Sequence, residues 1–337
     1  MINYLPFVSI IIPCRNEEKY IGRCLGSVIK QDYPKEKMEI LVVDGMSKDR
    51  TKKIVEELKI KNLELEMKVL DNPQKFTPFG LNIGVKTAQG EIIIRMDAHA
   101  TYQKDYVSKC IKYLDKYKTD NVGGVIKTLP GADTFVAKAI ALCLSHFFGA
   151  GNSYFRIGSE KPQFVDTVFG GCYRKAIFDK IGLFNEKMTR SQDFEFNLRL
   201  KQSGGKILLV PDIISYYYSQ PTILGFLKHN FIDGFWVTYP YFKFKIEAFS
   251  WRHLTPLVFV SSLIVTFLLS FFSNLFLFLF IFGLFIYIFF NLYFSFKIAR
   301  RQKDLRYFLI LPIIFIIRHV PYGLGSALGV IKSLKKD

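Results

Sequence analysis

The feature that most constrains this chain is a long stretch near its C-terminus that carries no charged side chain. Residues 254–296 contain no Asp, Glu, Lys or Arg. A membrane-spanning helix needs about 20 apolar residues, so this stretch is long enough for two spans. We predict a first span over residues 254–272, a turn at Ser273 and Asn274, and a second span over residues 275–296.

The segments around these spans are rich in basic residues. Residues 226–253 mix Phe, Tyr and Trp with Lys, His and Arg, a composition typical of segments at the membrane interface. The segment KIARRQKDLR, residues 297–306, follows the second span, and strongly basic loops of this kind stay on the cytoplasmic side. We therefore predict a multi-pass protein of the cell membrane, with residues 1–225 forming a cytoplasmic domain and residues 254–337 a membrane region.

The last apolar segment, about residues 307–331, is interrupted by Arg318, His319 and Pro321. A charged side chain in the middle of a bilayer costs several kcal/mol unless it is paired. We expect a broken or re-entrant segment that packs on the two spans. A complete third span is the alternative.

The whole chain of 337 residues has a net charge of +17, which suits nucleic acid, acidic lipid or phosphorylated substrates. No RNA-binding motif or recognition-helix pattern stands out, so we predict no nucleic-acid partner. Anionic lipid headgroups account for the basic residues near the spans. The five cysteines show no C-x-x-C spacing, and we expect them to be reduced thiols, most of them buried.

The N-terminal part alternates apolar runs with segments of helical spacing. The apolar runs lie at residues 8–12, 40–43 and 92–94, and residues 67–70 form a plausible further strand. Strands and helices that alternate in this way predict right-handed βαβ units and a mostly parallel sheet of Rossmann type. Neither a G-x-G-x-x-G nor a P-loop motif follows the first run, which excludes the usual dinucleotide and P-loop modes of phosphate binding.

Acidic residues follow three of the predicted strands: Glu17, Asp44 and Asp97. Ligands of such sheets bind beyond the carboxyl ends of the strands. Three acids at one edge suit a ribose, a base amide and a metal-bound diphosphate. For Asp44 taken alone, capping of the next helix is the alternative role.

Asp97 and His99 form a D-x-H pattern directly after the strand at residues 92–94. A carboxylate and an imidazole that turn toward one point can bind a divalent ion. Imidazole is compatible with Mn²⁺ and less natural for Mg²⁺, which prefers oxygen ligands, so Mn²⁺ is the predicted ion. The alternative is that Asp97 caps the next helix or turn and His99 has no role.

Five segments within about residues 5–220 carry a resemblance to a known family: VSIIIPCRNEEKYIGRCLGSVIKQDYP, ILVVDGMSKDRT, LNIGVKTAQGEIIIRMDAHATY, FVDTVFGGCYRKAIFDKIGLFNE and SQDFEFNLRLKQSGGKI. In this order they resemble family 2 glycosyltransferases of the GT-A fold, and in particular the branch of the succinoglycan-biosynthesis ExoA type. The resemblance implies a GT-A α/β catalytic domain that uses a UDP-sugar, UDP-glucose or a relative.

The resemblance also implies roles for single residues. The D-x-D motif of the family corresponds here to Asp97-Ala98-His99, and this chain has Asp44-Gly45 where many members have two Asp residues. The residues implied to bind the nucleotide sugar are Pro13, Arg15, Glu17, Asp44, Lys75 and Asp97.

On the acceptor side, Asp193 lies in the first turn of a predicted helix and resembles the general base of the family's E-D motif, with Gln192 in place of Glu. Helix N-termini carry acids routinely, which is the alternative explanation. Asp166 is the second candidate base, and we expect it to order the acceptor loop. Gly170 and Gly171 allow the backbone to approach a sugar closely, or form an ordinary turn.

Together these features predict a membrane-anchored, inverting and metal-dependent glycosyltransferase that acts on a lipid-linked saccharide in the synthesis of a cell-surface glycan. One carboxylate is sufficient for a single displacement, because no covalent sugar intermediate forms. Two alternatives are transfer directly onto polyprenyl phosphate, and a membrane protein that binds nucleotide sugars without chemistry.

Overall fold

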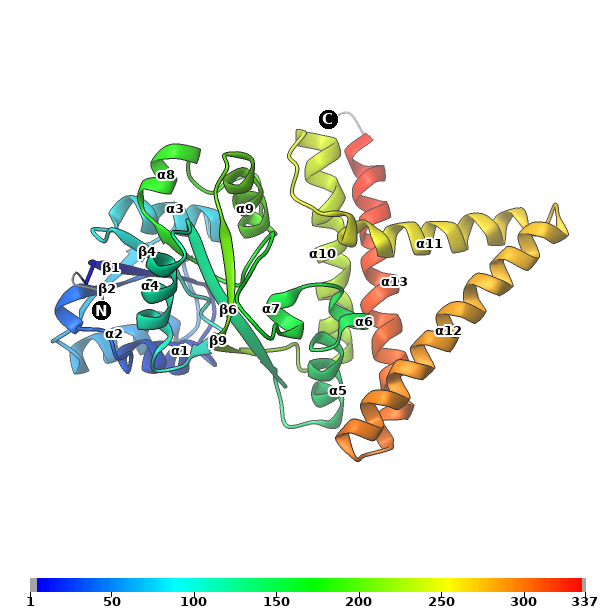
Figure 1. The fold of residues 1–337 in the computed structure, drawn as a ribbon, viewed down its shortest axis with the longest axis horizontal. Coiled ribbons are helices and arrows are strands. Elements are labelled where there is room, and N and C mark those ends of the chain that lie inside the picture. The colour runs from blue at the N-terminus through cyan, green and yellow to red at the C-terminus, as the bar shows by residue number, and fades with distance from the viewer. Residues whose placement is uncertain (1–4, 335–337) are drawn as a thin grey trace. The chain divides into compact units, whose positions relative to one another are not determined.

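The computed structural model describes residues 5–334, which form two compact units (Figure 1). The first unit comprises Met1–Lys127 and Tyr154–Tyr218. The second comprises Thr128–Ser153 and Ser219–Asp337. The segment Thr128–Ser153 therefore belongs to the second unit, although the chain before and after it belongs to the first.

The first unit is built on one sheet, which has nine strands in the described residues and the order β3-β2-β1-β4-β8-β6-β9-β5, with β7 beside β9. The strands are β1 (Val8–Cys14), β2 (Met38–Asp44), β3 (Glu66–Asp71), β4 (Ile92–Arg95), β5 (Ala100–Tyr102), β6 (Asn121–Leu129), β7 (Gln163–Phe164), β8 (Cys172–Arg174) and β9 (Ile207–Tyr218).

Helices lie on both faces of this sheet. Residues of α1, α2 and α4 share one apolar core with the strands, and residues of α3, α8 and α9 share the other. The helices of this unit are α1 (Ile21–Ile29), α2 (Thr51–Lys61), α3 (Thr77–Thr87), α4 (Tyr106–Lys116), α7 (Tyr154–Ile157), α8 (Ala176–Ile181) and α9 (Gln192–Gln202), with a 3₁₀ turn at Lys35–Lys37.

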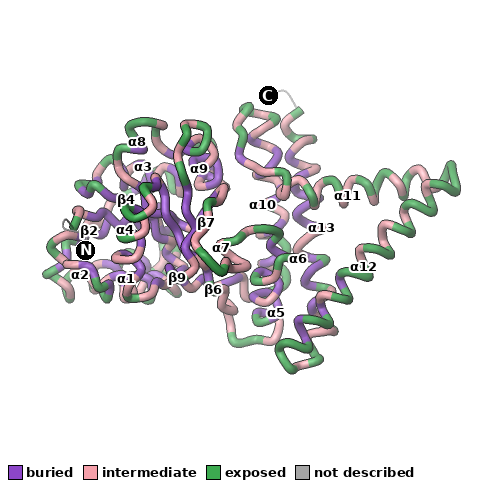
Figure 2. Tube along the Cα trace, viewed as in Figure 1, coloured by how far each residue is buried: buried purple, intermediate pink, exposed green. Residues whose placement is uncertain are grey.

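The strands at the centre of the sheet are buried on both faces, which explains their unbroken apolar runs. All seven residues of β2 are buried, as the tube in Figure 2 shows for the inner strands. The sheet is parallel from β3 through β2 and β1 to β4, as the alternation of strands and helices predicts. Beyond β4 it is mixed, because β8 runs antiparallel to both β4 and β6. All five cysteines are free and buried.

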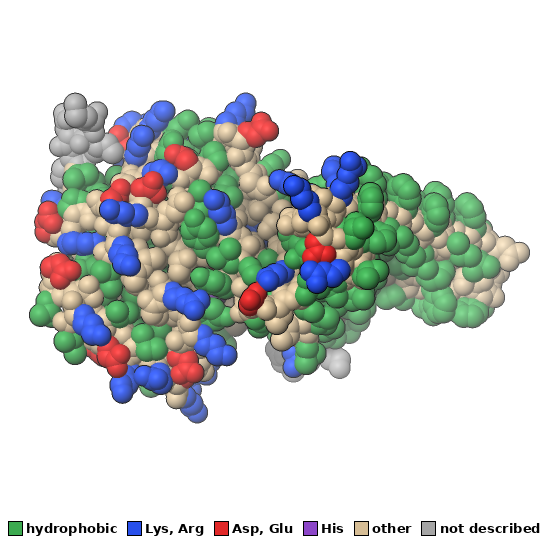
Figure 3. All heavy atoms as spheres, turned by 90° about the horizontal axis from the view of Figure 1, so that it is seen from below, with side chains coloured by type: hydrophobic (Ala, Val, Ile, Leu, Met, Phe, Trp, Pro, Cys, Tyr) green, Lys and Arg blue, Asp and Glu red, His purple; other side chains and the backbone are tan. Residues whose placement is uncertain are grey.

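The second unit is helical. Its helices are α5 (Phe135–Leu144), α6 (Phe147–Ala150), α10 (Ile223–Phe244), α11 (Trp251–Leu269), α12 (Asn274–Gln302) and α13 (Arg306–Leu334). Three of them, α11, α12 and α13, are long and apolar enough to cross a membrane. Large hydrophobic side chains are exposed along α11 and α12, and Figure 3 shows hydrophobic side chains gathered over these helices.

Helix α13 is continuous from Arg306 to Leu334, so the break expected near Arg318 is not present in the chain. A proline at position 321 removes the backbone donor to the carbonyl of Ile317, four residues earlier. The side-chain amide of Asn230 on α10 replaces it, donating to the Ile317 oxygen at 3.2 Å. Arg318 is paired as well, because it donates to Asn230 Oδ1 at 2.6 Å and to the Gly149 carbonyl oxygen at 2.8 Å.

Replacing Asn230 by alanine is therefore expected to destabilise the second unit. The change removes an acceptor of Arg318 and the substitute donor to Ile317, and an unsatisfied buried polar group costs about 1–3 kcal/mol. In detergent, the apparent melting temperature should fall by about 5 °C. Asn274→Ala, at the exposed start of α12, is the matched control. Equal melting temperatures for the two variants would contradict this account of the helix.

Candidate functional site

The loops after β1 and β2 are tied to each other at the carboxyl edge of the sheet. The backbone N–H of Asn16 donates to Ser47 Oγ at 2.9 Å, and that of Glu17 donates to Thr51 Oγ1 at 2.7 Å. Asn16 adopts a left-handed backbone conformation, which is uncommon for residues other than glycine. Strain of this kind is found preferentially at binding sites.

The residues predicted to hold the nucleotide lie around these loops. Pro13 lies in β1 opposite Val43 of β2. A Cβ atom on Gly45 would lie 3.1 Å from Arg15 Cβ and 3.2 Å from the carbonyl oxygen of Lys75. The loops that carry Arg15, Gly45 and Lys75 therefore lie against one another. This crowding explains why glycine follows Asp44 here.

Asp44 itself is 3% exposed, and its Oδ2 atom accepts a hydrogen bond from the backbone N–H of Ser47 at 3.0 Å. It thus caps the turn after β2. Helix α2 has a different acceptor at its start, since Asp49 Oδ1 accepts from the N–H of Thr51 at 3.0 Å. Contact of Asp44 with a ribose or a base stays a prediction.

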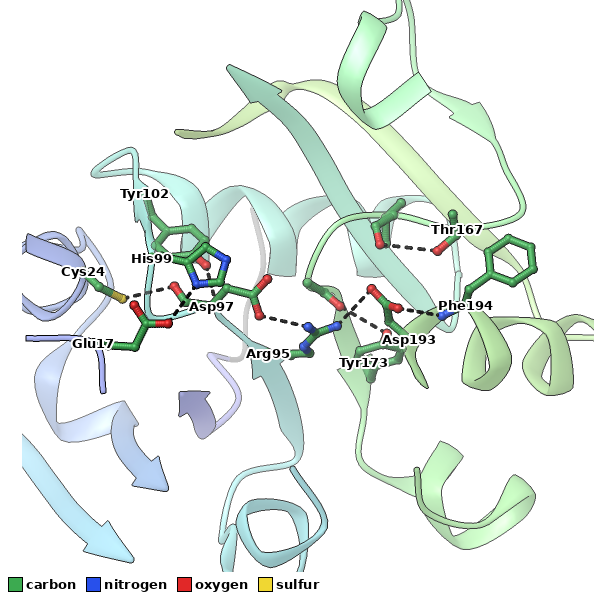
Figure 4. A network of polar contacts seen from close by, with 12 residues as sticks. Glu17, Cys24, Arg95, Asp97, His99, Tyr102, Thr167, Tyr173, Asp193 and Phe194 are labelled. Atoms are coloured by element: carbon green, nitrogen blue, oxygen red, sulfur yellow. Dashed lines mark hydrogen bonds and ion pairs between the residues drawn. The ribbon is translucent and has the colours of Figure 1, made fainter. Parts of the chain in front are cut away.

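Glu17, Asp97 and His99 come together at the ends of β1 and β4 (Figure 4). Nδ1 of His99 lies 3.3 Å from Oε1 of Glu17. Burial would lower the pKa of His99, but the hydrogen bond to Glu17 and the charge of Asp97 outweigh this effect and raise the pKa above its usual value. The hydroxyl oxygen of Tyr102 accepts a hydrogen bond from the backbone N–H of Asp97 at 2.7 Å.

Arg95 lies between the carboxylates of Asp97 and Asp193. Its Nη2 atom lies 2.9 Å from Oδ1 of Asp97, and its Nη1 atom lies 3.1 Å from Oδ2 of Asp193. Burial would lower the pKa of Arg95, but the charges of Asp97 and Asp193 outweigh this effect and raise it. The guanidinium group therefore stays protonated between the two acids.

Asp193 is the second residue of α9, and its side chain is 30% exposed. Its Oδ1 atom accepts a hydrogen bond from the N–H of Phe194 at 2.9 Å. Glu195 is excluded from the same site, because it is buried in a two-point ion pair with Arg199, at 2.6 and 2.9 Å. Asp193 is thus the acid at this helix end that combines contact with Arg95 and access to solvent.

The Gly170–Gly171 turn lies against the backbone of Arg95. Both glycines have positive φ angles, +69° and +114°, which favour glycine. A Cβ on Gly170 would come within 2.7 Å of the Arg95 carbonyl oxygen, and the Gly171 carbonyl accepts from the Arg95 N–H at 3.0 Å. The positive φ angles and this close approach to Arg95 explain why both positions are glycine. Contact of the turn with an acceptor stays a prediction.

The remaining residues predicted to bind the acceptor are Asp166 and Gln192. Asp166 lies in the segment between β7 and β8, and Gln192 is the first residue of α9 and is buried. Thr167, next to Asp166, accepts a hydrogen bond through Oγ1 from Asn197 of α9 at 2.9 Å. This contact ties the loop of Asp166 to the helix that carries Asp193.

Asp97 and His99 fit a divalent ion whose remaining coordination positions are filled by substrate and water. Within residues 5–334 no group of three or more His, Cys, Asp and Glu side chains is placed to hold a metal ion. Asp97 and His99 offer one carboxylate and one imidazole, and Mg²⁺ and related ions are commonly bound by one or two protein groups together with phosphates and water. With Nδ1 of His99 facing Glu17, Nε2 is the ring nitrogen left for a metal.

No role was predicted for Arg95 from the sequence. The sequence did carry a signal for it: Arg95 ends the apolar strand β4, and a strand that is buried along its whole length also buries the arginine at its end. A buried charge requires a partner of opposite sign. The identity of the second partner, Asp193, could not be read from the sequence, because it comes from a distant helix.

Comparison with known proteins identifies the family. A family model described as "Glycosyl transferase family 2" matches residues 9–182, more than half of the chain. The chain belongs to glycosyltransferase family 2. The resemblance seen in its sequence segments is thereby confirmed.

Named relatives of this glycosyltransferase span most of its length. One is a dolichyl N-acetyl-alpha-D-glucosaminyl phosphate 3-beta-D-2,3-diacetamido-2,3-dideoxy-beta-D-glucuronosyltransferase of Methanococcus voltae. It is 34% identical over 234 residues, which are 68% of this chain and 72% of the relative. Another is the succinoglycan biosynthesis protein ExoA of Rhizobium meliloti, which is 26% identical over 67% of this chain and 72% of the relative.

The fold has a solved counterpart. The mannosyltransferase PcManGT of Pyrobaculum calidifontis, solved in complex with GDP-Man and Mn²⁺, matches 99% of this chain and 89% of its own with a TM-score of 0.64 and 18% identity. The predicted fold class, a GT-A α/β domain followed by a helical region long and apolar enough to span a membrane, is confirmed.

The contact between Glu17 and His99 leads to a prediction about metal binding. A carboxylate that orients a ligating histidine typically contributes 10–100-fold to metal affinity. We expect Glu17→Gln to weaken Mn²⁺ binding in the presence of UDP by about tenfold, measured by electron paramagnetic resonance of free Mn²⁺. Glu36→Gln, at an exposed position, should bind Mn²⁺ like the wild type. Unchanged affinity in Glu17→Gln would show that Glu17 does not orient a metal ligand.

Proposed function

We propose that this glycosyltransferase moves a sugar from a UDP-sugar to a lipid-linked saccharide at the cytoplasmic face of a cell membrane, with inversion at the anomeric carbon. The observation that carries the proposal is the grouping of Glu17, Asp97 and His99 at the strand ends, together with the ion pairs of Arg95 with Asp97 and Asp193. The ion pairs of Arg95 join the strand ends that would bind a donor to the start of α9, where Asp193 presents a solvent-accessible carboxylate.

On the donor side, the loops that carry Arg15, Asp44 and Lys75 meet beyond the ends of the parallel strands. This is the edge at which α/β sheets bind their ligands. A guanidinium and an ammonium group are suited to phosphate oxygens. Asp97 and His99 would hold a divalent ion, with Mn²⁺ favoured by the imidazole ligand. When bound, such an ion offsets negative charge on the departing diphosphate.

On the acceptor side, we assign Asp193 as the general base. An acceptor hydroxyl has a pKa far above 7, so it needs a positioned base while it attacks the anomeric carbon. The carboxylate takes the proton as the new glycosidic bond forms and the bond to UDP breaks. Asp166, Gly170 and Gly171, in the segment between β7 and β8, and Gln192, next to Asp193, would shape the acceptor site.

A lipid-linked acceptor is supported by the second unit and by the relatives. Three helices are long and apolar enough to cross a membrane, and the Methanococcus voltae relative is named for a dolichyl-linked sugar phosphate. We propose that these helices make the enzyme a multi-pass membrane protein. The basic residues of the segment 297–306, at the end of α12 and directly after it, would lie on the cytoplasmic side, in keeping with the positive-inside rule.

Asp193→Asn tests the base directly. The variant keeps the shape of the side chain but cannot take the proton, so transfer should fall by about 100-fold or more while UDP binding is retained. We would measure UDP release and the mass of lipid products with a panel of UDP-sugars and a lipid extract, and UDP affinity by calorimetry. Asp179→Asn changes an exposed acid in the first turn of α8 and should transfer at the wild-type rate.

Three other outcomes would contradict parts of this proposal. A wild-type protein that binds UDP-sugar and never releases UDP would be a binding protein without chemistry. An Asp193→Asn variant with a substantial rate would indicate an acceptor that is already ionised, such as polyprenyl phosphate. A product with the donor's anomeric configuration would exclude a single inverting displacement.

A further inference from the structure

Arg95 holds a position in the catalytic unit that neither the donor nor the acceptor assignments explain. Its side chain is 7% exposed, at the end of the buried strand β4. The guanidinium group contacts Asp97 at 2.9 Å and Asp193 at 3.1 Å. Figure 4 shows the three side chains in a row, with Arg95 in the middle.

We propose that Arg95 is a positioning residue that fixes the general base relative to the donor's phosphates. The inference rests on the proposed function, in which Asp97 serves the donor and Asp193 serves the acceptor. Because one rigid group contacts both carboxylates, the distance between them is set by the guanidinium plane. The hydroxyl that approaches Asp193 is thereby aligned with the anomeric carbon of a donor held at Asp97.

The contacts of Asp193 support this role. Apart from the bond that its Oδ1 atom accepts from the neighbouring Phe194 N–H, its carboxylate is held through Oδ2 by Arg95. Without Arg95 the side chain would be free to rotate toward solvent. A general base that is misplaced by about 1 Å can cost on the order of 100-fold in rate.

Arg95 is itself held in place from behind. Its backbone N–H donates to the Gly171 carbonyl at 3.0 Å, and the positive φ of Gly170 brings that residue against the Arg95 carbonyl oxygen. The Gly170–Gly171 turn therefore acts on the reaction through Arg95. This gives the two glycines a role that does not depend on contact with a sugar.

The guanidinium group also has unused hydrogen-bonding capacity. Among the described residues, Nε and Nη1 of Arg95 are buried and have no hydrogen bond of good geometry, although Nη1 is close to Asp193. Catalytic hydrogen bonds are often poorly aligned without substrate and tighten in the reactive complex. The Nη1–Asp193 contact is expected to tighten in this way once the acceptor is bound.

An arginine serves this purpose better than a lysine would. The guanidinium group presents several donors in a planar fork, so it can hold two carboxylates at once, whereas an ammonium group is a compact point charge on a flexible stem. Arg95→Lys keeps the buried positive charge and loses the fork. Arg95→Gln loses both.

The test compares kinetic constants in Arg95→Gln, Arg95→Lys and a control. We expect Arg95→Gln to lower kcat on the order of 100-fold with little change in KM for the UDP-sugar, and Arg95→Lys to recover part of the rate. The control is Arg174→Gln on the neighbouring strand β8, whose side chain is 43% exposed and lies 3.9 Å from Asp115. It should keep the wild-type kcat.

A double-variant cycle separates positioning from a structural role. If Arg95 acts through Asp193, adding Arg95→Gln to Asp193→Asn removes little further activity, because the base is already lost. Losses that multiply in the double variant would overturn the inference, as would a loss confined to the donor's KM. If Arg95→Gln does not fold, Arg95→Lys decides: a lowered kcat at an unchanged melting temperature supports the inference, and an unchanged kcat overturns it.

The wild-type enzyme distinguishes this inference from the proposed function. A wild-type protein that transfers no sugar overturns both. A wild-type protein that transfers sugar while Arg95→Gln keeps its full kcat overturns the inference alone.

Discussion

The catalytic unit depends on the pairing of one buried cation with two carboxylates. Arg95 ends a strand whose every residue is buried, and a charge in such a place is stable only when opposite charges accompany it. Asp97 is close in sequence and Asp193 is far from it, so the pairing requires that the start of α9 lie beside the end of β4. The electrostatic demand of a single side chain thus helps to specify the arrangement of the sheet's carboxyl edge.

The sequence predicted those parts of the fold and site whose signals are local. Apolar runs revealed β1, β2 and β4, because strands buried on both faces need little polar alternation, whereas β3 carries Lys68, is only partly buried, and gave a weaker signal. The mixed half of the sheet was not predicted, since β8 has only three residues and carries no periodic signal. The contact between Glu17 and His99 follows from two strand ends at one edge. The pairing of Arg95 with Asp193 depends on tertiary structure and has no local signal.

In the second unit, too, buried polar groups find their partners on an element distant in sequence. Arg318 and Pro321 predicted a broken helix because each is unfavourable in an apolar helix considered alone. Asn230 on another helix satisfies both of them, by accepting from Arg318 and donating to the carbonyl that Pro321 leaves without its backbone partner. A charge or a proline breaks an apolar helix only if neighbouring helices offer no partner, and a neighbour's contribution cannot be read from the helix itself.

The balance of charge explains why a histidine can stand where the family's motif has a second acid. Glu17, Asp44, Asp97 and Asp193 already place four carboxyl groups on the loops and strand ends of this unit, and a diphosphate would add further negative charge. A fifth acid, at position 99, would increase that repulsion, whereas an imidazole adds none and becomes positive when protonated. The contact with the Glu17 carboxylate raises the pKa of His99 and so favours the positive form of the ring when no metal ion is bound there. Arg95 also offsets negative charge, since it pairs with both Asp97 and Asp193, and this balance would allow the proposed base to lie beside an anionic donor.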